Sequence, residues 1–253
     1  MTEKVQKFNF LSKIIKFIKR SPKKDVLKNC SIHRLYKYPS IKADCFIPLG
    51  EACRPAYWLR ETGLRYCSLP FDWMMSYSLK TVSVILDKGM DSWFVRYKED
   101  KKRKEDPWKR FVIDVKNKIS SMHDFSKEQT VKEGMPKFKE KYKRRYERMK
   151  KILSTSKSVC FVCNRADNSE DFSSFLIKVK KMYPELSVSL VNIRHSDDEQ
   201  KIIKYELGKK VYLYEITAND IHKGSDNFWI GNDDLWKGIC AKFKLSSKKN
   251  NLS

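Results

Sequence analysis

The last third of the chain alternates short apolar runs with one amphipathic run, and this pattern limits the folds that the chain can adopt. The run SVCFVC at 158–163 predicts a buried strand, 171–182 predicts a helix, and 186–193 predicts a second strand. A further strand is expected over 210–216. Strands that alternate with helices pair in parallel through crossover connections. We therefore predict an α/β fold with a central mixed sheet flanked by helices.

The first two thirds contain further candidate elements. A strand is expected over 44–49, followed by a helix in which Pro55 suits the first turn and Gly63 suits a left-handed end. The charged run 97–110 is expected to be an exposed loop. The remaining expectations are helices over 78–88, 136–153 and 229–243, and a strand over 111–115. Together these elements predict a single domain over 43–245 and a disordered tail over 246–253.

The net charge of the chain indicates which classes of partner it could bind. Lysine and arginine number 54 against 31 acidic residues, a formal net charge of +23, so anionic lipid and nucleic acid both have to be considered. Nucleic acid is not expected as a partner, because no helix-turn-helix, zinc-finger or RNA-binding sheet signature accompanies the charge. A solvated basic surface without a specific partner is the simpler alternative.

Residues 1–24 form an amphipathic pattern with apolar side chains on one arc of a helix and lysines on the other. Such a basic N-terminal helix suits the surface of an anionic membrane. The alternative is a terminal helix that packs on the domain. No run of 18 uncharged residues that could span a membrane and no secretory peptide are recognised. We expect a cytoplasmic protein that is peripheral on the inner membrane face.

Most of the seven cysteines lie among apolar neighbours, where free thiols pack as small hydrophobic side chains and indicate a reducing compartment; these are Cys45, Cys160, Cys163 and Cys240. Cys160 and Cys163 form a lone CxxC in a strand-like run with no second pair and no nearby histidine. Zinc is therefore not expected there, and no metal or cofactor is predicted.

Cys53 differs from these cysteines because it stands between a glycine turn at Gly50 and the start of a helix, in LGEACRPAYWLR. Backbone N–H groups at a helix start lack internal partners and favour negative charge. With Arg54 adjacent, this position predicts a thiol pKa lowered from about 8.5 towards neutrality. The same N–H groups could receive an oxyanion. The alternative is that Cys53 only fills space at the helix start.

The segment LGEACRPAYWLRETGLRYCSLPFDWM resembles the signature of a bacterial domain family of papain-like cysteine peptidases. The matching positions are Leu49, Gly50, Cys53, Ala56, Leu59, Arg60, Gly63, Leu64, Arg65, Ser68, Pro70, Phe71, Asp72 and Trp73. Shorter similarities continue at His123, Asp124 and Phe125, at Arg144 and Arg145, at Phe161 and at Trp236. The resemblance spans roughly residues 43–245.

The resemblance implies a catalytic pair of Cys53 as nucleophile and His123 as base. An imidazole titrates near pH 6.5, so it can take the thiol proton and return one to a leaving group. For a third residue that orients the ring we expect Asp72 first and Asn164 second. Asp124 is less suitable, because neighbouring side chains of an extended segment point to opposite faces. Asp72 could instead serve only as a turn residue that caps a helix start.

Further candidates lie beside the signature cysteine. We expect the substrate to contact Arg60, Arg65 and Trp73. Papain-type folds place the cysteine on a helix and the histidine on an antiparallel sheet, whereas the last third of this chain predicts parallel strands. The fold class would be α+β if the resemblance extends to the whole fold.

These observations favour a thiol-dependent acyl-transfer enzyme, a hydrolase or peptidase that acts on an acyl or peptide substrate. One alternative is a membrane-associated transferase or a non-catalytic binding protein in cell-surface glycan or lipid biosynthesis. Another, glycosyl transfer from a nucleotide sugar, ranks lower because the chain has no clear Asp-x-Asp pair.

Overall fold

A computed structural model describes residues 27, 30–103, 106–224 and 227–246 of the chain. The helix expected over 1–24 and all but the first residue of the tail expected over 246–253 lie outside the described residues. The described part is a mixed α/β structure with a six-stranded sheet, two smaller sheets and five α-helices.

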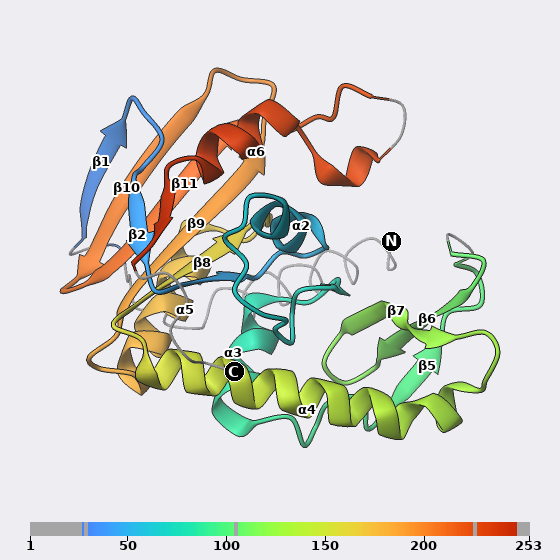
Figure 1. The fold of residues 1–253 in the computed structure, drawn as a ribbon. Coiled ribbons are helices and arrows are strands. Elements are labelled where there is room, and N and C mark those ends of the chain that lie inside the picture. Colours follow the sequence, from blue (N-terminus) through green and yellow to red (C-terminus); the bar gives the residue numbers. More distant parts are fainter. Residues whose placement is uncertain (1–26, 28–29, 104–105, 225–226, 247–253) are drawn as a thin grey trace, which may run out of the picture.

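The main sheet has the strand order β1-β10-β11-β9-β8-β3 (Figure 1). Four of its strands are parallel: β3 pairs with β8, β8 with β9, and β9 with β11. Strands β10 and β1 are added by antiparallel pairing at the edge opposite β3. The bounds are β1 Ser31–Leu35, β3 Cys45–Pro48, β8 Ser158–Cys163, β9 Ser187–His195, β10 Lys201–Gly208 and β11 Val211–Ala218.

Helices cover both faces of this sheet. One face packs against α3 (Leu79–Lys88), α4 (Val131–Thr155) and α5 (Ser169–Met182), and the other against α2 (Arg54–Glu61) and α6 (Asp233–Cys240). Strand β8 shows why the sheet needs both layers: Phe161 faces the first cluster and Cys160 the second, and both are buried. A parallel strand that is apolar on both faces is stable only when both are covered.

A second, antiparallel sheet lies apart from the first and has the order β4-β7-β6-β5. Its strands are β4 Met74–Met75, β5 Tyr97–Glu99, β6 Lys109–Asp114 and β7 Ile119–Ser126. Helix α4 runs beside it, and its start is fixed by a capping box between Thr130 and Glu133. A short parallel pair, β2 (Ile41–Ala43) with β12 (Phe243–Leu245), joins the two ends of the domain.

The structure confirms the strands expected in the last third, adds one strand there, and corrects two other expectations. Strand β10 was not predicted, although it forms an antiparallel hairpin with β11. The segment 97–110 is not all loop, because it contains β5 and the start of β6. The expected helix over 229–243 is divided into a short 3-10 helix Phe228–Ile230, then α6, then β12. Gly231, whose φ is +74°, interrupts the helical backbone between the 3-10 helix and α6.

Candidate active site

Cys53 is the N-cap residue of α2, at the end of a tight connection from β3. Its carbonyl accepts the first helical hydrogen bond, from the N–H of Tyr57 at 2.9 Å. Gly50 is required in this connection because a Cβ there would lie 2.6 Å from Cδ of Pro55. The side chain of Cys53 is buried, with 7% of the residue exposed. The loop thus holds the thiol at the carboxyl edge of the parallel strands.

His123 reaches the same place from the antiparallel sheet. Ser121 of β7 pairs with Val112 of β6, and Phe125 pairs with Arg110, so three residues of β7 oppose one of β6. His123 is the middle residue of this bulge. Bulges of this kind bend a strand and redirect its side chains, and they are common beside active sites. Nε2 of His123 lies 3.6 Å from Sγ of Cys53, and the imidazole is exposed whereas the sulfur is not.

The environment of Cys53 corrects the expected pKa. Burial raises the pKa of its thiol to about 11, its own backbone N–H opposes the rise, and the Asp72 carboxylate adds to it. The guanidinium of Arg54 is directed to other partners than the sulfur. It donates to Asp220 at 2.6 Å and to the carbonyl of Trp229 at 2.7 Å. The resting site therefore holds a neutral thiol, and the adjacent imidazole is the group that can remove its proton.

Asp72 is buried near the pair, but it does not contact the histidine. Its Oδ2 accepts hydrogen bonds from the guanidinium of Arg65 and from the backbone N–H of Leu69. Burial raises the pKa of this carboxyl, while Arg65 acts in the opposite direction. Its Oδ1 has no hydrogen-bond partner within the described part of the chain. Direct orientation of His123 by Asp72 thus has no hydrogen bond to support it.

The other two candidates for orienting the ring also point elsewhere. Nδ2 of Asn164 donates to the carbonyl of Ile193 at 2.7 Å and to Asp220 at 3.3 Å. The carboxylate of Asp124 is held by α4 and by its own strand, and it accepts hydrogen bonds from Ser121, Lys141 and Tyr142. Asp124 therefore anchors the bulge that carries His123 and does not hydrogen-bond the imidazole.

The three expected substrate contacts form a stack beside the pair. The ring of Trp73 meets His123 edge-on, with centroids 6.3 Å apart. The guanidinium carbons of Arg60 and Arg65 lie 5.6 and 5.7 Å from the Trp73 ring centroid. Arg65 is already engaged by Asp72 and Ser68. Arg60 is exposed and pairs with Glu61 on its own helix. Trp73 thus presents a flat ring beside the imidazole, and the exposed Arg60 cation lies against that ring.

Two buried charged residues at this edge of the sheet were not predicted from the sequence. Arg165 follows β8, and its guanidinium donates to Asp167 and to the carbonyls of Leu49 and Tyr77. This ties the connection that precedes Cys53 to the start of α3, beside a cavity of about 490 Å³.

The second missed residue is Asp220, which follows β11 and binds Arg54. A signal existed for both, because each charged residue lies a few positions beyond the end of a predicted apolar strand. In a parallel sheet, such positions gather at one edge.

Among the described residues, none of the helices combines the length and the apolar character that a membrane span requires. No group of three or more histidine, cysteine, aspartate or glutamate side chains is arranged to hold a metal ion within the same residues.

The fold and the site define a class of protein: an α/β domain in which a cysteine at a helix start meets a histidine from an antiparallel sheet. Residues 44–197 match the model of the family described as "Putative papain-like cysteine peptidase (DUF1796)", and the chain belongs to this family. Both residues of the pair lie inside the matched range.

The chain is also similar to "Uncharacterized protein R408" of Acanthamoeba polyphaga mimivirus, with 31% identity over 133 residues. That similarity covers 46% of this chain and 60% of the relative, so the chain spans about three fifths of the relative's length. No solved structure matches the chain.

Proposed function

We propose that the protein is a thiol-dependent acyl-transfer enzyme that acts as a hydrolase or peptidase. The observation that carries this proposal is the 3.6 Å approach of Sγ of Cys53 to Nε2 of His123. Cys53 lies at the start of α2, His123 lies in β7 of the antiparallel sheet, and the two are 70 positions apart in the chain. Membership of a family described as papain-like cysteine peptidases supports the same chemistry.

The proposed reaction uses the imidazole twice. His123 takes the thiol proton as the sulfur of Cys53 adds to the carbonyl carbon of the substrate. The tetrahedral intermediate then collapses, and the leaving amine or alcohol departs with the proton from His123. Water, or an acceptor alcohol or amine, next attacks the thioester with His123 as base. The released thiolate regains a proton, so the enzyme returns to its starting state.

The start of α2 suits the charge that develops on the substrate. The first N–H groups of a helix have no intrahelical acceptor, and the peptide dipoles place partial positive charge at that end. Donors held in this way stabilise an oxyanion more than the neutral carbonyl. Because Cys53 is the N-cap residue, a carbonyl bound to its sulfur lies next to these groups. Trp73 lies edge-on to the imidazole and Arg60 lies over the Trp73 ring, so we expect an acyl or peptide substrate to approach along these side chains.

The test is a comparison of wild-type protein with Cys53→Ser, Cys53→Ala and His123→Gln, using p-nitrophenyl acetate and a peptide library as substrates. We expect ester hydrolysis with an initial burst in wild type, and a loss of at least 100-fold in each variant. Iodoacetamide should label Cys53 at pH 7 faster than the half-buried Cys67, and His123→Gln should remove this advantage. Hydrolysis that survives Cys53→Ala would overturn the proposal.

Whether the enzyme hydrolyses or transfers the acyl group depends on the acceptor, which is water in hydrolysis and an alcohol or amine in transfer. The N-terminal segment indicates a place where such an acceptor could be located. We propose that residues 1–24 bring the domain to an anionic membrane at the cytoplasmic face. Supporting this are the apolar arc and the lysines of that segment. Full-length protein should bind phosphatidylglycerol vesicles in low salt, and deletion of residues 1–24 should abolish binding. A transferase or a non-catalytic binding protein at that surface is the alternative, and an inert Cys53 would favour the binding protein.

A further inference from the structure

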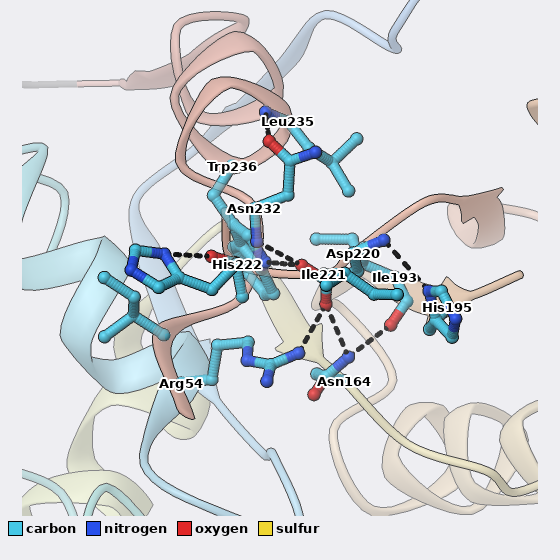
Figure 2. Close-up of polar contacts among 12 residues, drawn as sticks. Arg54, Asn164, Ile193, His195, Asp220, Ile221, His222, Asn232, Leu235 and Trp236 are labelled. Atoms are coloured by element: carbon cyan, nitrogen blue, oxygen red, sulfur yellow. Dashed lines mark hydrogen bonds and ion pairs between the residues drawn. The ribbon is translucent and has the colours of Figure 1, made fainter. Parts of the chain in front are cut away.

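The carboxylate of Asp220 receives four hydrogen bonds just beyond the carboxyl end of β11 (Figure 2). Its side chain is fully buried. The donors are Nη1 of Arg54 at 2.6 Å, Nε1 of Trp236 at 2.9 Å, the backbone N–H of Asn232 at 2.9 Å and Nδ2 of Asn164 at 3.3 Å. A buried carboxylate with this many partners is a rigid junction, because losing any partner would leave a buried charge poorly solvated.

The junction reaches the nucleophile through Arg54, the residue that follows Cys53. Besides Asp220, the guanidinium of Arg54 donates to the carbonyl of Trp229 at 2.7 Å and to that of Phe228 at 3.4 Å. One turn further along α2, Nε1 of Trp58 donates to the carbonyl of Ile230 at 2.7 Å. The first two turns of α2 are therefore held by Asp220 and by the backbone carbonyls of residues 228–230.

The chain around Gly231 is packed so closely that there is no room for a side chain at this position. A Cβ at Gly231 would lie 2.2 Å from Oδ1 of Asp220 and 3.0 Å from the guanidinium of Arg54. Gly231 also has φ +74°, which disfavours any other residue. Directly after it, the side chain of Asn232 caps α6 by accepting from the N–H of Leu235 at 3.2 Å.

We propose that Asp220 is a positioning residue for Cys53. Its contact with Arg54 fixes the first turn of α2 and thereby the distance from the sulfur to His123, and it also pairs the cation of the residue that follows Cys53 in the chain. The role of Cys53 in this inference rests on the proposed function. Asp220 lies beyond residue 197, where the family match ends, so Asp220 and residues 228–232 become part of the active-site architecture.

The titratable and charged groups around the thiol determine what can be measured. These are His123 from β7, Asp72 with its partner Arg65, and the phenol of Tyr77. Arg54, with its partner Asp220, is the cation that follows Cys53 in the chain. Asp220→Asn removes the counter-charge of Arg54 and leaves the other groups in place. Arg54→Gln removes the cation itself. The two variants should impair positioning alike but should affect the ionisation of the thiol differently.

The experiment compares these variants by ester hydrolysis and by the pH profile of iodoacetamide labelling at Cys53, with labelling of Cys67 as internal reference. Both variants should lower kcat about tenfold or more with little change in KM, because small misplacements of reacting groups are costly. The double variant should be no slower than either single one. Asp220→Asn should move the labelling profile of Cys53 about one pH unit lower, because an unpaired cation favours the thiolate. Arg54→Gln should not.

Asp44→Asn is the matched control, since the carboxylate of Asp44 accepts two backbone N–H groups at the opposite end of β3 and β8. It should lower stability without changing kcat or the labelling profile of Cys53. Wild-type kcat and an unmoved profile in Asp220→Asn would overturn the inference. Should that variant not fold, an unchanged kcat in Arg54→Gln would do so. Activity that survives Cys53→Ala would instead refute the proposed function, while the labelling profile would still test the contact between Asp220 and Arg54.

Discussion

At the scale of single residues, the site depends on side chains that are buried or closely packed. The thiol of Cys53 has a pKa of about 11 because burial disfavours the thiolate. At neutral pH only a very small fraction of such a thiol is ionised. Reactivity at that pH therefore has to come from proton transfer to His123 during attack, which sets this site apart from one that rests as a thiolate.

The pH dependence of labelling follows from this assignment. In His123→Gln, the rate of Cys53 alkylation by iodoacetamide should rise about tenfold per pH unit from pH 7 and level off near pH 11, where the thiol ionises. Wild type should exceed this variant most at pH 7 to 8 and approach it at high pH. Mass spectrometry of the labelled peptide measures both profiles. A midpoint near pH 8 in His123→Gln would contradict the assignment.

Gly50 offers a second residue-scale prediction. In Gly50→Ala the new methyl would lie 2.6 Å from Cδ of Pro55, and backbone and ring cannot both stay in place. We expect a loss of about 2 kcal/mol or more in unfolding free energy, together with loss of Cys53 reactivity. Gly208→Ala is the control, because nothing lies within 4 Å of its Cβ, although its φ of +146° adds strain. Urea unfolding and labelling of the two variants separate strain from steric displacement of α2.

At the scale of elements, the position of His123 depends on a bulge and on the helix that anchors it. Three residues of β7 oppose one of β6, and Asp124 ties this bulge to α4 through Lys141 and Tyr142. The family resemblance suggested a role for the His123 position and made Asp124 the less suitable residue to orient its ring. In the structure the Asp124 carboxylate accepts from Ser121, Lys141 and Tyr142. The bulge was not predictable, because its register depends on pairing with a strand that was only partly recognised.

The anchor can be tested directly. Asp124→Asn should weaken the contacts to Lys141 and Tyr142 and lower the unfolding free energy by about 1 to 3 kcal/mol. Because the bulge is then free to shift, the rate of ester hydrolysis should fall at least as much as in a variant that loses the same unfolding free energy at another position. Glu128→Gln, an exposed change just after the same strand, should leave both quantities unchanged. Wild-type turnover in a destabilised Asp124→Asn would show that the bulge does not need this anchor.

At the scale of the whole molecule, the sheet and its two helical layers bury thiols that ionise far above their ordinary range. Burial raises the pKa of Cys45 and of Cys160 to about 12, from about 9. Such groups remain protonated in the folded state at a pH where they ionise in the unfolded chain. Their contribution is complete below about pH 9 and is lost as the pH rises towards 12.

Stability should therefore fall in alkaline solution. Each fully buried thiol should lower the unfolding free energy by about 1.4 kcal/mol per pH unit above pH 9. Urea unfolding under reducing conditions at pH 8, 9, 10 and 10.5 measures the slope. Cys160→Ala should be less stable at pH 8, because a cavity replaces the sulfur, but its stability should decline less steeply with pH. Equal slopes in the two proteins would contradict the linkage.

The sequence by itself determined the elements whose signals are local. Apolar runs specified β8, β9 and β11, amphipathic spacing specified α4 and α5, and glycine and proline marked the start and end of α2. Only the tertiary structure decided which side chains meet. The approach of Cys53 to His123, the engagement of Asp72 by Arg65, and the junction at Asp220 join residues whose neighbours are set by sheet order and strand register. The thiol pKa was mispredicted for the same reason, because desolvation depends on everything packed around the sulfur, and a helix start alone does not determine it.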